Sequence, residues 1–576
     1  MVKIAAALAA MVLVSGAPGA RAASAVGQWH GDLHPAPGAT LRLALKLDQN
    51  SAGVWSGALE SLDQGGGALP LADVEATSNS LSFTVPVAHG RFEGRWDARA
   101  NAWAGQWAQG GRALPMTFVS GPPQAQPKIL GLDGAWEGTL DTSAGIKLRL
   151  ALHFSTGPYG TSGRLDSLDQ AAYGLPLADI THQGARVSFA VPSVGGTFEG
   201  TLGAAGKITG TWSQGGAGLP LTFAKRPAGA PEARLSRPQT PRPPYPYRVE
   251  DVAFDDAAGH DRLAGTLTLP PGKGPFPAVV LIAGSGAHDR DETIFGHRPF
   301  RVLADHLTRR GLAVLRYDKR GVGASTGDYA SATTADFADD ANAAVRFLAA
   351  RRDIDGRRIG LIGHSEGGLI APMVAYRDRK VAFVVLMAGP AVNGADLLEA
   401  QQKRINEVMG LGGDRLAEAS AEEARMIDIV RKSASPAQAA EALKAEADAV
   451  ADRTGAPKEL AEARAAELES PWFRSFLAYD PAPALQRLRI PVLALIGSVD
   501  VQVPADQNIP ALRAALAQDR RATVEELPGL NHLFQPATTG APGEYVEIET
   551  TIAPAALDTI TQWILRTMGG GARAGS

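Results

Sequence analysis

The chain has 576 residues, which at roughly 150 residues per domain predicts three or four domains. Apolar residues make up 45% of the chain and charged residues 20%, a composition that excludes wholesale disorder. A net charge of −4 gives no reason to expect nucleic acid as a partner, and the absence of cysteine excludes disulfides, thiolate metal sites and cysteine nucleophiles.

Residues 1–22 have the pattern of a signal peptide: Lys3 is the positive start, Ile4–Val14 is apolar, and Ala20–Ala22 is a small-residue cleavage site. The apolar stretch is about half of the ~20 residues that a spanning helix needs, which favours cleavage over an uncleaved membrane anchor. No later segment is apolar enough to span a bilayer. We therefore expect a periplasmic or secreted protein with no integral membrane span, whose folding does not depend on oxidation.

The first half of the chain contains an internal repeat, in which five short motifs return at an offset of 105 to 107 residues. The pairs are Gly27–Gly31 with Gly134–Gly138, Ser61–Gln64 with Ser167–Gln170, Leu69–Asp73 with Leu175–Asp179, Phe92–Gly94 with Phe198–Gly200, and Trp107–Gly111 with Trp212–Gly216. This nearly constant offset predicts two duplicated modules, residues 26–120 and 132–225.

Each module is predicted to be all-β. Apolar residues alternate with polar or small ones in Leu41–Leu47 and Lys147–Leu152, and turn residues recur about every ten positions. The pattern indicates about eight antiparallel strands per module, enough for a small closed or nearly closed barrel.

Four tryptophans, at positions 29, 107, 136 and 212, either fill the cores of the two modules or line a ligand cleft. A cleft would favour contact with a glycan or another envelope component.

A proline-rich linker, residues 226–247, follows the modules and cannot form a core. From 248 to 568, continuous apolar strands alternate with helices, which predicts an α/β domain with a mainly parallel sheet. The expected strands are Ala278–Ile282, Leu312–Tyr317, Arg358–Ile362, Val381–Leu386, Val492–Ile496 and Ala522–Leu527, and Ala335–Arg351 is an expected helix.

Residues 391–485 interrupt this alternation with about a hundred residues rich in Ala and Glu at helical spacing. Ser435–Gln438 has the pattern of a helix start, with proline at the first position and a capping glutamine. We predict a helical lid over the carboxyl edge of the sheet. Its apolar end, which contains Trp472 and Phe473, either faces the active site or packs onto the sheet.

The pentapeptide Gly363–Gly367, G-H-S-E-G, lies between an expected strand and an expected helix. Its glycines permit a tight turn that presents Ser365 as a nucleophile. A serine hydroxyl needs a base, and His532 is the one histidine that follows the motif. Asp500, after the Val492–Ile496 strand, is the expected acid that orients the imidazole. Asp506 and Asp480 are the alternatives.

An oxyanion formed on acyl attack needs two backbone donors. The amide of Glu366 is one candidate, and the amide of Ser285, in a glycine-containing loop after the first strong strand, is the other. Gly286 is an alternative donor. The candidate substrate-binding residues are Gly286, His288, Trp472 and Phe473. The charged run 289–291 could also contact substrate, whereas 317–323 is expected to be loop scaffolding.

No histidine pair has the spacing of metal ligands, and Gly321 and Gly323 do not extend to a dinucleotide-binding motif. The sequence therefore predicts neither a metal nor a cofactor.

The C-terminal part resembles bacterial α/β-hydrolases of the esterase D kind, near the dienelactone-hydrolase and prolyl-oligopeptidase-like branches. The motifs that carry this resemblance are Ile282–Gly286, Asp289–Asp291, Asp318–Ser325, Gly363–Gly368, Gly497–Asp500 and Leu530–Gln535. The resemblance covers a little over half of the chain. It implies hydrolysis of short acyl esters by a triad of Ser365, Asp500 and His532.

We therefore predict a serine carboxylesterase that forms an acyl-enzyme on small ester substrates of short to medium acyl length. Two alternatives stay open: a serine peptidase of the aminopeptidase or prolyl-oligopeptidase kind, and an envelope- or glycan-binding protein with secondary hydrolase activity.

Overall fold

The computed structural model describes residues 25–36, 39–63, 67–88, 90–109, 112–141, 147–169, 172–214, 217–227, 236–256, 260–454 and 468–569. The predicted signal peptide, residues 1–22, lies outside the described residues. Among the described helices, none combines the length and the apolar character that crossing a membrane requires.

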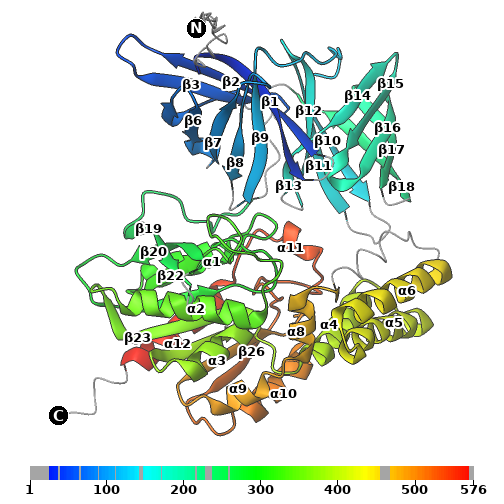
Figure 1. The fold of residues 1–576 in the computed structure, drawn as a ribbon. Coiled ribbons are helices and arrows are strands. Elements are labelled where there is room, and N and C mark those ends of the chain that lie inside the picture. The colour runs from blue at the N-terminus through cyan, green and yellow to red at the C-terminus, as the bar shows by residue number, and fades with distance from the viewer. Residues whose placement is uncertain are drawn as a thin grey trace, which may run out of the picture. The chain divides into compact units, whose positions relative to one another are not determined.

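The first β module is one curled sheet with the strand order β4-β3-β2-β1-β9-β8-β7-β6-β5 (Figure 1). Its strands are β1 (Gly27–Ala36), β2 (Ala39–Gln49), β3 (Trp55–Ser61), β4 (Ala68–Pro70), β5 (Ala72–Ala76), β6 (Ser80–Val85), β7 (Gly90–Asp97), β8 (Ala102–Gln109) and β9 (Arg112–Ser120), with the short helix η1 (Pro86–Ala88). The strands β4 and β5 stand at opposite ends of the order, yet only Leu71 separates them in the chain. The sheet must therefore curl back on itself, as a nearly closed barrel does.

The second module has the same strand order, β13-β12-β11-β10-β18-β17-β16-β15-β14. Its elements are β10 (Gly134–Asp141), β11 (Lys147–Gly157), β12 (Gly160–Ser167), β13 (Ala172–Pro176), β14 (Ala178–Gln183), β15 (Arg186–Val191), η2 (Pro192–Val194), β16 (Gly196–Gly203), β17 (Lys207–Gln214) and β18 (Ala217–Lys225). The all-β prediction is confirmed, with nine strands in each sheet in place of about eight. Common origin by duplication stays a prediction.

The four tryptophans of the repeat are buried, each at most 4% exposed. The indole N–H groups of Trp29 and Trp136 donate to backbone carbonyls at 2.9 and 2.8 Å, and those of Trp107 and Trp212 donate to Gln109 and Gln214 at 3.0 Å. The rings therefore fill cores rather than line an open cleft. The same contacts engage Gln109 and Gln214 of the repeated segments, so the tryptophans and these glutamines have structural roles.

The third sheet, in the C-terminal part, has the order β19-β20-β22-β21-β23-β24-β25-β26. Its strands are β19 (Arg248–Asp255), β20 (Arg262–Leu269), β21 (Phe276–Ile282), β22 (Ala313–Tyr317), β23 (Ile354–His364), β24 (Val381–Met387), β25 (Val492–Gly497) and β26 (Thr523–Leu527). The pairs β19–β20 and β20–β22 are antiparallel, and all pairs from β22 to β26 are parallel. The predicted mainly parallel sheet is confirmed.

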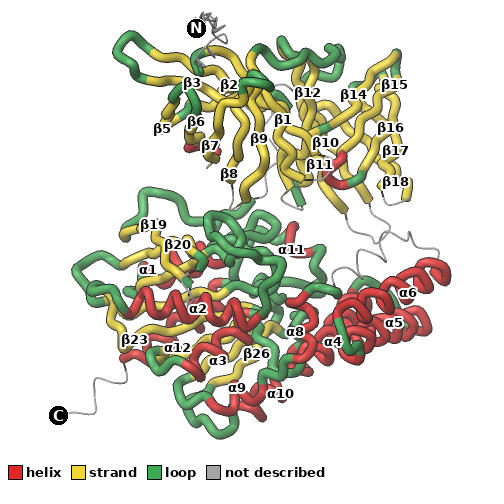
Figure 2. The backbone as a smooth tube through the Cα atoms, viewed as in Figure 1, coloured by secondary structure: helices red, strands yellow, loops and turns green. Residues whose placement is uncertain are grey.

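Alternate strand residues point to opposite sides of this sheet. Since apolar residues stand on both sides, helices cover both faces. Val280 and Ile282 belong to one core with α2 (Thr334–Ala349), α3 (Gly367–Arg377), α9 (Ala482–Arg487) and α10 (Ala505–Ala515). Val279 and Leu281 belong to another with α1 (Pro299–Thr308) and α12 (Pro554–Gly569). Figure 2 shows the change of class along the chain, from yellow strands in the modules to red helices around the third sheet. The short helix α11 (Glu544–Glu547) precedes α12.

Helices occupy the predicted insertion between β24 and β25: α4 (Gly394–Val408), α5 (Gly413–Lys432), α6 (Pro436–Thr454) and α8 (Pro471–Ala478). The start of α6 carries the predicted cap, because Ser435 Oγ accepts from the amide of Gln438 at 3.2 Å and the Gln438 side chain accepts from Ala434 at 2.9 Å. A separate apolar core, which includes Met426, Leu443 and Phe473, holds these helices together.

Gly360, in β23, lies directly under the ring of Phe383 on β24, and a Cβ atom there would overlap that ring. We expect Gly360→Ala to lower the free energy of unfolding of this domain by about 1–3 kcal/mol, since the ring and both strands must shift. Gly356→Ala is the matched control in the same strand, because its Cβ would meet nothing nearer than 3.6 Å. Urea unfolding of both variants makes the comparison, and equal midpoints would show that the ring adjusts freely.

Candidate active site

Ser365 stands at the turn between β23, which ends at His364, and α3, which begins at Gly367. Its backbone is in the left-handed region, with φ of 53°. The neighbouring glycines make this turn possible, because a Cβ on Gly363 would overlap Gly367 and a Cβ on Gly367 would overlap the carbonyl of Ile282. The chain thus crosses tightly from strand to helix, the geometry that exposes a nucleophilic side chain at the sheet edge.

His532 and Asp500 meet from the loops that follow β26 and β25. The imidazole Nδ1 of His532 donates to Asp500 Oδ2 at 2.9 Å, and both side chains are buried. The other carboxylate oxygen accepts from the amides of Gln502 and Val503 at 2.8 and 2.9 Å. This bonding fixes the proton on Nδ1 and leaves Nε2 as the basic nitrogen.

The two alternative acids lie in other contacts. Asp506 pairs with Arg404 of α4 at 2.6 Å, and Asp480 accepts from the amide of Ala482 at 3.0 Å.

A cavity of about 250 Å³ opens beside Ser365 and His532. Among the residues predicted from the sequence, Ser285, His288, Glu366, Trp472 and Phe473 also line it. Its further lining residues are Gly284, Glu292, Ile294, His364, Pro390, Leu397, Leu398, Gln401, Gln402, Glu423, Phe476, Gln502, Val503 and Leu533. The cavity is thus closed by the sheet edge on one side and by α4, α5 and α8 of the insertion on the other.

Gly286, a predicted substrate contact, is not among the described residues that line this cavity. The His288 ring lies close to Gly286, with Nε2 3.2 Å from where a Gly286 Cβ would be. The same Nε2 forms a hydrogen bond with the carbonyl oxygen of Ser285 at 2.7 Å. Burial lowers the pKa of the His288 imidazole. His288 therefore borders the cavity, whereas Gly286 is not among the described lining residues.

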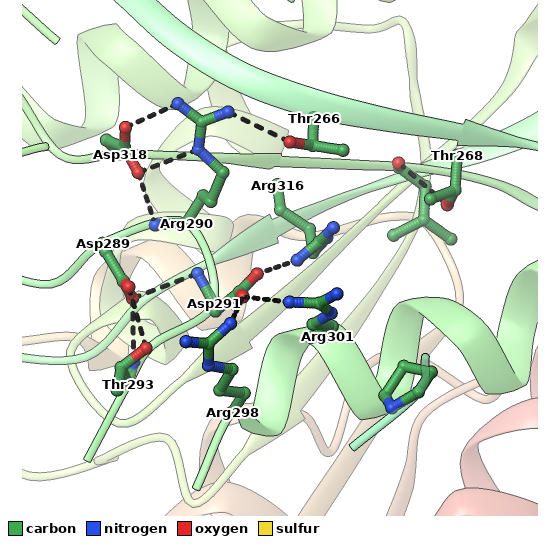
Figure 3. A network of polar contacts seen from close by, with 12 residues as sticks. Thr266, Thr268, Asp289, Arg290, Asp291, Thr293, Arg298, Arg301, Arg316 and Asp318 are labelled. Carbon is green, nitrogen blue, oxygen red and sulfur yellow. Dashed lines mark hydrogen bonds and ion pairs between the residues drawn. The ribbon is translucent and has the colours of Figure 1, made fainter. Parts of the chain in front are cut away.

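The charged run 289–291 builds a scaffold beside the site rather than a wall of the cavity (Figure 3). Arg290 makes a two-pronged contact with Asp318 at 3.0 and 2.7 Å and also donates to Thr266 at 3.0 Å. Asp291 pairs with the buried Arg316 and lies 3.6 and 3.8 Å from two further arginines, at positions 298 and 301. Residues 289–291 are not among the described residues that line the cavity, and the side chains of Arg290 and Asp291 are engaged by these oppositely charged partners.

The loop that contains Gly284 runs against Ser365: a Cβ on Gly284 would lie 3.1 Å from Ser365 Cβ. Lys319 Nζ donates to the Gly284 carbonyl at 2.6 Å and to Glu366 Oε2 at 3.0 Å. The ammonium also lies 4.3 Å from the centre of the Phe337 ring. Sequence reasoning treated the Lys319 turn as scaffolding, and no pattern in it indicated a buried cation next to the nucleophile.

Glu366 connects the site to the insertion. Its Oε1 accepts from Thr334 Oγ1 at 2.8 Å and from the indole N–H of Trp472 at 2.6 Å. The carboxylate is 1% exposed, so these donors and Lys319 supply the hydrogen bonds that water would otherwise make.

Two further buried residues, Glu292 and His364, were not predicted as functional. Glu292 Oε1 accepts from the amide of Gly284 at 2.7 Å and from His364 Nδ1 at 3.0 Å, and His364 Nε2 lies 3.0 Å from the carbonyl oxygen of His532. His364 is the second residue of the pentapeptide, and this position was a signal that it lies at the site. Glu292 carries no sequence signal beyond its place after a charged run.

Within the described part of the chain, no group of three or more His, Asp or Glu side chains is arranged to hold a metal ion. The chemistry that the described residues offer is that of a serine, a carboxylate-oriented imidazole and backbone amides beside an enclosed cavity.

Comparison with known proteins shows what this region is similar to. Residues 279–548 match the model of the alpha/beta hydrolase family. Esterase EstD of Thermotoga maritima is 29% identical over 307 residues, which cover 53% of this chain and 66% of EstD. Esterase FrsA of Yersinia enterocolitica is 29% identical over 180 residues, which cover 31% of this chain and 40% of FrsA. The chain thus spans just under two thirds of the length of EstD and a smaller part of FrsA.

Among solved structures, the Pyrococcus furiosus esterase Pf2001 is similar over 56% of this chain and 91% of its own, with 15% identity and a TM-score of 0.35. The alpha/beta hydrolase GrgF of a Penicillium species covers 56% of this chain and 99% of its own, with 18% identity and a TM-score of 0.35.

The bond from Trp472 to Glu366 anchors α8 to the sheet edge. We expect Trp472→Phe to speed amide hydrogen exchange in α8 about tenfold, because one charge-assisted hydrogen bond is lost while the ring still stacks on Phe476. Thr334→Val is the matched control, since it removes the other donor to the same Glu366 oxygen from α2. Equal exchange rates in α8 for the two variants would show that the indole bond does not hold the insertion.

Proposed function

We propose that the C-terminal domain, in which residues 279–548 match the alpha/beta hydrolase family model, hydrolyses carboxylic esters, with Ser365 as nucleophile, His532 as general base and Asp500 as the acid that orients it. The observation that carries this proposal is the buried hydrogen bond from His532 to Asp500 beside a cavity that Ser365 also lines. An imidazole held in one tautomer by a carboxylate is the base that a serine hydroxyl needs to attack an acyl carbon.

In the proposed reaction, His532 Nε2 takes the proton of Ser365 as its Oγ bonds to the ester carbonyl carbon. The tetrahedral intermediate collapses, the alcohol leaves with the proton from His532, and Ser365 retains the acyl group as an ester. Water then attacks this acyl-enzyme with His532 again acting as base, and the carboxylic acid is released. Asp500 stabilises the imidazolium in both steps.

The amides of Ser285 and Glu366 are the proposed oxyanion donors. Glu366 is the residue after the nucleophile and precedes the first turn of α3, where backbone N–H groups and the helix dipole favour negative charge. The Gly284 amide is committed to Glu292 at 2.7 Å, which supports Ser285, the next residue of that loop, as the second donor.

The acyl group is proposed to lie among apolar residues of the insertion, namely Leu397, Leu398, Trp472, Phe473 and Phe476. A cavity of about 250 Å³ is at the lower end of small-molecule sites, which supports short to medium acyl chains. The leader pattern of residues 1–22 supports export, so the proposed place of action is the periplasm or the cell exterior.

Ser365→Ala is expected to reduce hydrolysis of p-nitrophenyl acetate, butyrate and octanoate by at least ~1,000-fold, because the nucleophile is lost. Asp500→Asn is expected to reduce it by at least about 100-fold through loss of the oriented tautomer. Asp506→Asn is the matched control, since this exposed carboxylate contacts Arg404 and the amide of Gln507. Activity that survives in Ser365→Ala, or an equal loss in the two aspartate variants, would contradict the assignment.

A second candidate, hydrolysis of substrates that carry an amino group, as a peptidase requires, is favoured by Glu423. Among the described residues of the insertion it is the one carboxylate that lines the cavity, and it is 8% exposed. A carboxylate in such a place is suited to bind an ammonium group of a substrate.

Glu423→Gln is expected to lower kcat/KM for aminoacyl-p-nitroanilides or aminoacyl esters tenfold or more, because a lost hydrogen bond to a charged group costs ~1.5 kcal/mol or more. Hydrolysis of p-nitrophenyl butyrate is expected to be unaffected. Glu422→Gln, on the same helix but outside the cavity lining, is the control. If the wild type prefers the uncharged esters and Glu423→Gln changes neither substrate class, the peptidase candidate fails.

A further inference from the structure

Glu292 and His364 form a polar contact beside the site, between the loop after β21 and the end of β23. Glu292 is 2% exposed and His364 is 6% exposed. The backbone of Glu292 has a φ of 52°, a conformation that costs free energy and persists where surrounding contacts enforce it. Here it aims a carboxylate at the inside of the protein.

With Glu292 ionised, the hydrogen bonds of His364 require protons on both ring nitrogens. Nδ1 faces a carboxylate oxygen of Glu292, and Nε2 faces the carbonyl oxygen of His532, each at 3.0 Å. A carbonyl oxygen only accepts, and so does an ionised carboxylate, whereas a neutral imidazole has one N–H to give. An imidazolium beside an ionised Glu292 satisfies both contacts and leaves no buried charge without a partner.

The electrostatic surroundings favour a protonated His364 and an ionised Glu292. Burial by itself would lower the pKa of the His364 imidazole, but the Glu292 carboxylate and the His532 carbonyl raise it above its ordinary value. Burial would likewise raise the pKa of the Glu292 carboxyl, but His364 holds it below its ordinary value.

We propose that Glu292 and His364 are positioning residues, a buried ion pair that fixes the proposed general base and the proposed oxyanion loop relative to each other. This inference rests on the proposed function, because it assigns the pair to that reaction. His364 holds the backbone of His532 itself, and the same Glu292 oxygen holds the amide of Gly284, one residue before Ser285. One pair thus ties two segments that lie 248 positions apart in the chain, Gly284 and His532.

The pair acts on the transition state rather than on substrate binding. The apolar residues proposed to hold the acyl group come from the insertion, which neither Glu292 nor His364 contacts through a hydrogen bond described here. Both side chains border the cavity, yet a displaced base or oxyanion donor lowers kcat while the apolar residues proposed to hold the acyl group keep their places.

The first test is the protonation state of His364 in the full chain, measured by NMR with ¹⁵N-labelled histidine and assigned by the resonance that is lost in His364→Gln. The expected result is that both ring nitrogens carry a proton at pH 7. A neutral His364, with one bare ring nitrogen, would overturn the ion pair.

The second test is kinetic, with p-nitrophenyl butyrate as substrate. His364→Gln and Glu292→Gln are each expected to lower kcat about 100-fold with KM within threefold, and the double variant should regain at least tenfold over either single variant, because it leaves no unpaired buried charge. His306→Gln, which affects only a contact with Asp558 at 3.5 Å, is the control. Strictly additive losses, or losses confined to KM, would overturn the positioning role.

The two tests separate this inference from the proposed function. A wild type that hydrolyses no ester refutes the function and with it the positioning role, while the NMR measurement still decides the ion pair. An active wild type with a neutral His364 refutes the pair and leaves the function standing. Where the single variants fold poorly, the measurement on the wild type still decides.

Discussion

Charges buried at the carboxyl edge of the parallel sheet must neutralise one another, and the loops above the sheet are arranged around this constraint. Two ion pairs and one hydrogen-bonded pair lie there: Glu292 with His364, Lys319 with Glu366, and Asp500 with the imidazole of His532. Removing one partner of such a pair leaves a desolvated charge, which is far more costly than losing a surface contact. Since each pair joins two segments that are distant in the sequence, no loop of the site can move without breaking an electrostatic contact.

Two of these pairs converge on the backbone of Gly284. Glu292 accepts from its amide and Lys319 donates to its carbonyl, so both polar groups of the residue are fixed by buried charges. A glycine suits this point, because a Cβ atom on Gly284 would lie 3.1 Å from Ser365 Cβ, closer than ordinary Cβ contacts. A rigid, closely approaching backbone of this kind is what electrostatic preorganisation of an oxyanion site requires.

The insertion adds the apolar part of the site together with one buried carboxylate, Glu423. It has its own core, and it reaches Glu366 through the indole N–H of Trp472. This division lets the sheet edge supply the proposed chemistry while the helices determine the size and polarity of the cavity.

The repeated motifs of the β modules are explained mainly by contacts that build each sheet. In the first module Asp63 receives the guanidinium and the amide of Arg42, and in the second Asp169 receives the same groups of Arg149. These aspartates belong to the repeated Ser-Leu-Asp-Gln motif, so the motif preserves a strand contact.

The sequence by itself determined the classes of the three sheets, because a period of two in the modules and continuous apolar strands in the C-terminal part follow from which faces are buried. It also singled out Ser365, Asp500 and His532, since each stands in a turn next to a recognisable strand. Only the tertiary structure decided that Glu292, Lys319 and His364 are buried partners, that Gly286 lies outside the cavity lining while His288 borders it, and that the run 289–291 is a scaffold. These facts depend on which distant loops meet above the sheet, and the proximity of two charges from separate loops leaves no periodic pattern along the chain.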